Sequence, residues 1–121
     1  MTVKMGGGFV KSQTLKQNKD FRRLYYRGKS VASPCIVTYA MKSRGGVHYG
    51  ITTSKKIGNA VERNRSRRVI RAAFSELEEQ IGGNWDIIFV ARSKTSHVKM
   101  QQVHKEMAEH LKKLGVINEN G

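Results

Sequence analysis

Hydrophobic residues recur at helical spacing in three segments of this 121-residue chain. Phe21, Leu24 and Tyr25 predict a short helix that Asn18 caps and that ends at Gly28. The two later segments each end at glycine, the residue that most often follows a helix. The three helices are expected at residues 19–27, 60–81 and 98–114.

Strand patterns lie between these helices. Apolar and polar side chains alternate over residues 35–42, and Gly45-Gly46 is typical of a hairpin turn into a second strand over 47–54. The nearly unbroken apolar run from Trp85 to Ala91 predicts a central strand that is covered on both faces. A short strand is also expected over 29–32.

The element order α-β-β-β-α-β-α predicts an α/β (α+β) two-layer sandwich, with three helices on one mixed four-stranded sheet. The length suits one domain with its own hydrophobic core. We expect a flexible basic lead-in over residues 1–13, a single domain over 14–115 and a short tail over 116–121.

The charge is strongly positive and unevenly distributed. Residues 1–75 carry 17 basic and two acidic groups, a balance of +15, whereas residues 76–121 carry six basic and seven acidic groups. A compact domain with this surplus repels itself unless a polyanion neutralises it, and nucleic acid does so by releasing condensed counterions. An excess of positive charge that served only solubility need not be confined to one part of the chain, as it is here. The charge therefore predicts a nucleic-acid-binding protein.

Other classes of site find little support in the sequence. The only cysteine, Cys35, lies in an apolar segment and is expected to be a core residue, consistent with a reducing cytoplasm. No stretch approaches the roughly 20 apolar residues of a membrane span, so we expect no membrane partner. The four histidines lack the spacing of a zinc site, and no carboxylate pair or nucleophile motif suggests catalysis by the protein.

The densest basic segment covers residues 55–71, with seven basic residues and one acid, Glu62. On a helical wheel, Ile70 and Phe74 lie on one apolar stripe, whereas the arginines cover the adjoining flank. Arg63 falls on that stripe, one or two turns before the packing residues begin, and is expected to overhang the sheet edge and reach into a cleft. Guanidinium groups form bidentate hydrogen bonds with phosphate oxygens and stack on bases. A loop before a helix N-terminus is also a good binding site for anions. A solvated charged face is the alternative, but such a face more often mixes Lys with Glu.

The basic segment reads Lys55-Lys56-Ile57-Gly58-Asn59-Ala60-Val61, followed by Arg63-Asn64-Arg65, Arg67-Arg68 and Arg71. This motif resembles that of the protein subunit of bacterial ribonuclease P. Asp20-Phe21, the turn over residues 27–30 and the strand over 86–92 also match, so that the similarity covers about residues 14–114. Ser66 departs from the family, which more often has an aliphatic residue there.

The resemblance implies a protein that does not itself cleave RNA. A large catalytic RNA with bound Mg²⁺ performs the reaction, and the protein binds that RNA and the 5′ leader of precursor tRNA, in the cytoplasm and without a further protein partner. It also implies a left-handed crossover through the basic helix. By residue, it assigns RNA binding to Lys55, Lys56, Asn59, Arg63, Asn64, Arg65, Arg67, Arg68 and Arg71. It assigns the leader cleft to Phe21, Tyr25 and Tyr39.

The helical spacing alone favours a core role for Phe21 and Tyr25, and leaves Tyr39 open between core and cleft. Two other functions remain open. One is a non-catalytic ribosomal or RNA-assembly protein, which the co-purifying RNA would distinguish. The other is a DNA-binding protein, which is disfavoured because the basic helix also carries a core stripe and no helix-turn-helix partner precedes it.

Overall fold

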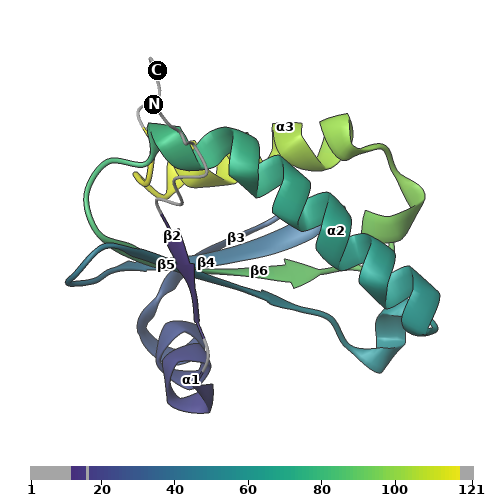
Figure 1. The fold of residues 1–121 in the computed structure, drawn as a ribbon, viewed down its shortest axis with the longest axis horizontal. Helices are drawn as coiled ribbons and strands as arrows, with labels where there is room; N and C mark the ends of the chain where they lie inside the picture. Colours follow the sequence, from purple (N-terminus) through teal and green to yellow (C-terminus); the bar gives the residue numbers. More distant parts are fainter. Residues whose placement is uncertain (1–11, 16, 118–121) are drawn as a thin grey trace.

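The computed structural model describes residues 12–15 and 17–117, which form one mixed sheet with helices on both faces (Figure 1). The strands are β2 (Ser12–Thr14), β3 (Lys29–Ala32), β4 (Ile36–Lys42), β5 (Val47–Thr52) and β6 (Trp85–Ala91). The helices are α1 (Asn18–Arg27), α2 (Ala60–Leu77) and α3 (Met100–Lys113), with short 3-10 turns η1 (Lys55–Ile57), η2 (Glu78–Gln80) and η3 (Thr95–His97). All three predicted helices and all four predicted strands are present, which confirms the α+β class.

The strands lie in the order β2-β5-β6-β4-β3, and the apolar strand β6 is at the centre. It pairs in parallel with β5 and antiparallel with β4, so that Ile88 lies beside both Gly50 and Tyr39. Every side chain of β6 except that of Val90 is buried, which confirms the predicted central strand. The chain passes from β5 through α2 to the neighbouring parallel strand β6; the left-handed sense of this crossover stays a prediction.

The predicted hairpin at Gly45-Gly46 is wrong, because β6 separates β4 from β5. The loop spreads around the start of β6: Trp85 N–H donates to the Gly46 carbonyl at 3.1 Å, and Gly46 N–H donates to Asn84 Oδ1 at 2.9 Å. Both glycines have positive φ, 81° and 107°. The insertion has a physical reason. A strand as apolar as β6 is better satisfied with a neighbour on each edge and cover on each face.

The packed domain extends beyond the predicted boundaries at both ends. The three-residue strand β2 pairs in parallel with β5 and was not predicted, because Ser12–Thr14 shows no apolar alternation. The rest of the expected lead-in, residues 1–11, lies outside the described residues. Val116 and Ile117, expected to begin the tail, are buried instead.

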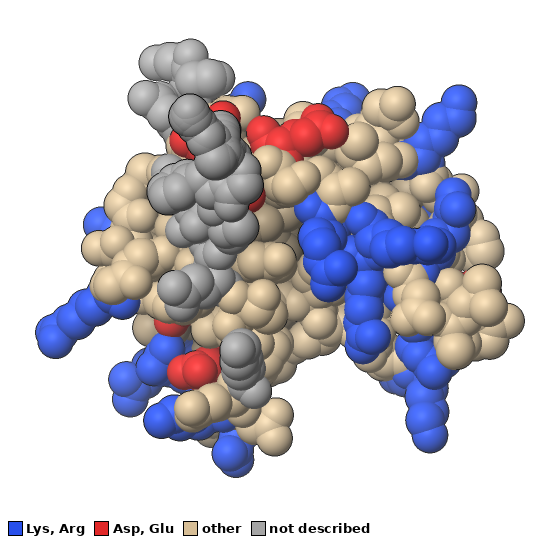
Figure 2. Space-filling model, viewed as in Figure 1, with Lys and Arg blue, Asp and Glu red and all other residues tan. Residues whose placement is uncertain are grey.

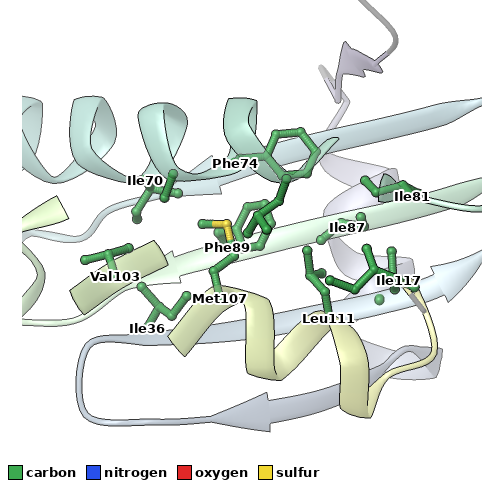
Figure 3. Packing of buried hydrophobic residues seen from close by; sticks show 14 of the residues in the cluster. Ile36, Ile70, Phe74, Ile81, Ile87, Phe89, Val103, Met107, Leu111 and Ile117 are labelled. Carbon is green, nitrogen blue, oxygen red and sulfur yellow. The ribbon is translucent and has the colours of Figure 1, made fainter. Parts of the chain in front are cut away.

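One face of the sheet packs against α2 and α3 (Figure 3). Ile70 and Phe74 from α2 and Met107 from α3 meet Phe89 and other inward side chains of the sheet. The Phe74 and Phe89 rings are 5.2 Å apart between centroids. This is the larger of the two cores, and it anchors the C-terminal turns of α2, as the helical wheel predicts.

The opposite face of the sheet carries α1, through a smaller core of Leu15, Leu24 and Ile88 (Figure 1). Phe21 packs against this core and lies over Gly50, where a Cβ atom would be only 2.7 Å from the Phe21 ring. Asn18 is the first residue of α1 and not its cap; Gln17 occupies that position without a side-chain hydrogen bond. The sheet is therefore covered by helices on both sides.

Among the helices in the described ranges, none combines the length and apolar character needed to cross a membrane.

Candidate nucleic-acid interface

The basic loop before α2 has a fixed conformation. Asn59 caps α2: its Oδ1 accepts from Glu62 N–H at 2.9 Å, and Glu62 Oε1 accepts from Asn59 N–H at 3.3 Å. Gly58 has a φ of 138°, and a Cβ there would collide with the Glu62 carboxylate. Lys55 and Lys56 are exposed beside this capped end. The loop thus places two ammonium groups next to the positive end of a helix dipole, where anions bind favourably.

The exposed side of α2 is lined by arginines. Asn64, Arg67, Arg68 and Arg71 surround one shallow hollow together with Val61, whereas Ser66 and Ile70 are buried on the other side of the helix. Lys and Arg side chains gather over α2 in the space-filling view (Figure 2). We call Lys55, Lys56, Asn59 and the Asn64, Arg67, Arg68 and Arg71 group the basic surface. The wheel correctly predicts the arginine side of this surface.

Two of the predicted RNA-binding arginines also bind the protein backbone. Arg63 Nη1 donates to the Gly58 carbonyl at 2.8 Å, and Arg65 Nε donates to the Ser96 carbonyl at 2.9 Å. Arg63 therefore braces the basic loop, whereas the sequence led us to expect that it would reach into a cleft. Arg65 joins α2 to η3 and does not line the hollow that Arg68 lines. Each guanidinium has further N–H groups, so both residues stay predicted RNA contacts.

The positive charge of α2 is not neutralised within the described part of the chain. The single acid in its first turns, Glu62, is engaged by the Asn59 N–H and by His97 Nε2 at 3.4 Å. The ion pairs found among the described residues include none of the arginines of α2. The buried stripe fixes the helix, and its uncompensated guanidinium groups can form strong charge-assisted hydrogen bonds with phosphate.

The three aromatic residues predicted for the cleft come together on the α1 side of the sheet. Tyr25 of α1 and Tyr39 of β4 meet edge to face, with ring centroids 4.9 Å apart and an interplanar angle of 87°. Phe21 and Tyr39 are half-buried against the smaller core, whereas Tyr25 is 43% exposed. We call these three residues the aromatic patch. Phe21 and Tyr39 therefore support the core and remain partly exposed.

A second charged hollow, which the sequence did not predict, lies between α1 and the start of β6. Buried Asp86 accepts from Arg23 at 2.8 Å and contacts His48 Nδ1 at 3.2 Å. Arg27, Lys42, Arg44 and other residues complete the lining. No periodicity brings these positions together, because their proximity depends on the insertion of β6 between β4 and β5.

The buried polar groups beneath α3 are structural. Glu106 accepts hydrogen bonds from Gln102 Nε2 at 2.7 Å, from Cys35 N–H at 2.9 Å and from the Ser33 hydroxyl. Burial opposes ionisation, but these three donors outweigh it and lower the pKa of Glu106 to about 2. Burial and the neighbouring Glu106 raise the pKa of Cys35 to about 11. The predicted core role of Cys35 is confirmed, since a buried thiol with this pKa is a poor nucleophile.

His110 is a further buried group of α3. Its Nδ1 lies 2.8 Å from Thr38 Oγ1, and burial lowers its pKa. Across the described ranges, no group of three or more His, Cys, Asp or Glu side chains is arranged to hold a metal ion.

Comparisons with known proteins point to one family. The family model described as Ribonuclease P matches residues 9–115. The ribonuclease P protein component of a Listeria monocytogenes strain is 41% identical over 104 residues, which cover 84% of this chain and 87% of that protein. The corresponding Clostridium botulinum protein is 32% identical over 111 residues, 90% of this chain and 100% of its own.

A solved structure gives the same result for the fold. The RNase P protein of Staphylococcus aureus superposes with a TM-score of 0.76 at 36% identity, over 87% of this chain and 97% of that one. The family match covers most of the chain, and the sequence motif includes the residues of the basic surface described above. The chain therefore belongs to the family of bacterial ribonuclease P protein components.

Proposed function

We propose that the basic surface binds the catalytic RNA of ribonuclease P, and that the aromatic patch binds the 5′ leader of precursor tRNA. The holoenzyme is an endoribonuclease that removes this leader to form the mature 5′ end of tRNA. The protein contributes binding and positioning, whereas the RNA carries the chemistry with Mg²⁺ that we expect to be held mainly by the RNA. The expected compartment is the cytoplasm, and no further protein partner is required.

The uncompensated arginines of α2 are the observation that carries this proposal. Arg67, Arg68 and Arg71 are exposed and line one hollow, and their helix is fixed from below by buried Ile70 and Phe74. A rigid helix that presents several guanidinium groups pays little conformational entropy when it binds a polyanion. The aromatic patch lies on the opposite face of the sheet, so one domain has separate surfaces for two RNA segments.

The test is reconstitution with a bacterial ribonuclease P RNA and labelled precursor tRNA. We expect the protein alone to cleave nothing, and the complex to release the leader. Arg68→Ala should weaken assembly with the catalytic RNA about tenfold, the usual order for losing a charged hydrogen bond. Its melting temperature should stay unchanged, because Arg68 is exposed.

Two variants sharpen this test. Lys105→Ala removes one exposed cation from α3, on another part of the surface, and should leave assembly nearly unchanged. Arg65→Ala should weaken assembly and also loosen η3, because it removes the contact with Ser96. Equal losses for Arg68→Ala and Lys105→Ala would mean that net charge alone drives binding, and would overturn the assignment to α2.

A further inference from the structure

The outer side of α1 carries an aromatic ring that the fold does not use. Tyr26 is 92% exposed, more than Val61 at 73% or Tyr25 at 43%, which are the other exposed large hydrophobic residues in the described ranges. The sequence resemblance assigns no role to Tyr26. An exposed tyrosine contributes little to stability, but its ring offers a flat surface on which an unpaired base can stack.

Cations surround this ring. Lys19, Arg22, Arg23 and Arg27 line a shallow hollow with Tyr26, and Arg22 lies one helical turn before it. Asp20 is the only acid in α1, and it contacts Arg23 at 3.4 Å. Lys19 and Arg22 have no carboxylate partner among the ion pairs found in the described part of the chain. The ring and its cations therefore match a base with a phosphate on either side.

This surface continues from the aromatic patch. Arg22, Tyr25 and Tyr26 line a second shallow hollow, and the Tyr25 ring also contacts Tyr39 at 4.9 Å between centroids. Tyr25 is thus shared between the sheet side and the outer side of α1. A single strand that stacks on the aromatic patch would next meet Arg22 and Tyr26.

The position of α1 indicates which RNA reaches it. α1 packs on one face of the sheet, whereas α2 packs on the other face (Figure 1). RNA that binds the basic surface therefore lies across the sheet from Tyr26. The single-stranded leader, which we place on the aromatic patch, is the nearer occupant.

We propose that the outer side of α1 is an extension of the leader site, in which Tyr26 stacks on an unpaired leader base and Lys19 and Arg22 bind the adjoining phosphates. This inference rests on the proposed function, because it requires the leader to cross the aromatic patch. It predicts that nucleotides further from the cleavage site contribute to binding, without reading a particular base.

The experiment measures the affinity of the assembled holoenzyme for precursor tRNAs with a graded series of leader lengths. For the unaltered protein, affinity should rise in two steps, as the leader reaches first the aromatic patch and then Tyr26. Tyr26→Ala should remove the second step, a loss of about fivefold, which corresponds to the lower end for stacking of one base. Tyr26→Phe should restore it, because the ring remains.

A leader that lacks one base tests stacking directly. Moving the abasic position along the leader should locate one nucleotide whose loss weakens binding to the unaltered protein but has no added effect in Tyr26→Ala. Arg22→Ala should lower the salt dependence of long-leader binding by roughly 0.7 in log affinity against log salt. Gln101→Ala, an exposed change on α3, serves as the surface control.

Three results would overturn the inference. If Tyr26→Ala binds every leader length as the unaltered protein does, while Tyr39→Ala loses leader affinity, the outer side of α1 is not used although the proposed function stands. If Tyr26→Ala weakens mature tRNA or assembly as much as long-leader binding, the occupant is not the leader. If neither Tyr26→Ala nor Tyr39→Ala distinguishes precursor from mature tRNA, the leader assignment of the proposed function fails as well.

Discussion

At the scale of single residues, Glu106 joins two segments that are distant in sequence. Its carboxylate on α3 accepts from Ser33 and Cys35 before β4, and from Gln102 one turn earlier on its own helix. A carboxylate held by three donors stays ionised when buried, because the hydrogen bonds favour its charged form. The sequence showed Glu106 only as one acid among several on the last helix, since nothing local marks its distant partners.

The lowered pKa of Glu106 predicts a pH dependence of stability. Its folded-state pKa of about 2 lies below the ordinary value of 4.5, so the unfolded chain binds the proton more readily. The stabilisation is complete above about pH 4.5 and is lost as the pH falls towards 2, with a slope of at most about 1.4 kcal/mol per pH unit. Urea unfolding across this range should show the slope.

Glu106→Gln should be less stable at neutral pH and should lose this part of the pH dependence. Glu109→Gln, an exposed change on the same helix, should keep it. Buried His110 also has a lowered pKa, so it removes stability in the same direction but from about pH 6.5 downwards. Identical pH profiles for Glu106→Gln and Glu109→Gln would contradict the role given to the Glu106 network.

At the scale of elements, α2 was predictable because its signals are local. The apolar stripe and the run of arginines both lie within a few turns of one helix. The pairing of β4 with β6 was not predictable in this way. The two glycines after β4 favour a hairpin between β4 and β5. This local preference is outweighed because the apolar strand β6 pairs with a strand on each edge. The hollow around Asp86 could not be predicted from the sequence for the same reason, because its lining residues come together only through this long-range pairing.

The aromatic residues of α1 should separate into structural and exposed roles. Phe21→Ala removes a ring that packs over Gly50 and against the smaller core, and should lower the free energy of unfolding by about 2 kcal/mol, below the usual 3–5 kcal/mol for a fully buried ring. Tyr25→Ala should cost less than about 1 kcal/mol, because the side chain is 43% exposed. Chemical unfolding of both variants measures this difference.

Binding measurements complete the comparison. If the aromatic patch holds the leader, both variants should bind precursor tRNA more weakly and mature tRNA almost normally. Tyr25→Phe should bind precursor normally, because the ring is kept. Losses that are equal for precursor and mature tRNA, and that follow the loss of stability, would show that Phe21 and Tyr25 serve the core alone.

At the scale of the whole molecule, the basic residues of α1 and α2 lie on opposite faces of the sheet. The basic surface of α2 lies on one side, and the cations of α1 lie on the other. Apart from Glu62 in the first turn, the acidic residues of α2 and η2 follow the last arginine of the helix along the chain. The negative charge of the partner could therefore be predicted from composition. The arrangement of the cations on two faces could be seen only in the folded structure.

This division predicts two separate salt dependences. Binding of the catalytic RNA should weaken with salt, and each of Arg67→Ala, Arg68→Ala and Arg71→Ala should reduce the slope of log affinity against log salt by roughly 0.7–0.9. Those variants should leave the salt dependence of leader binding to the assembled complex unchanged. Salt titrations of both steps check this, and a change in both slopes would mean that one continuous surface binds both RNAs.

The central position of β6 has a consequence for how the chain is made. β4 and β5 are synthesised early, but neither gains its inner neighbour until β6 has been translated, with the whole of α2 in between. Closing so long a segment is slow compared with forming a local hairpin. The arginines of α2 therefore leave the ribosome before the sheet that will support them, and the nascent chain is a polycation without a finished core.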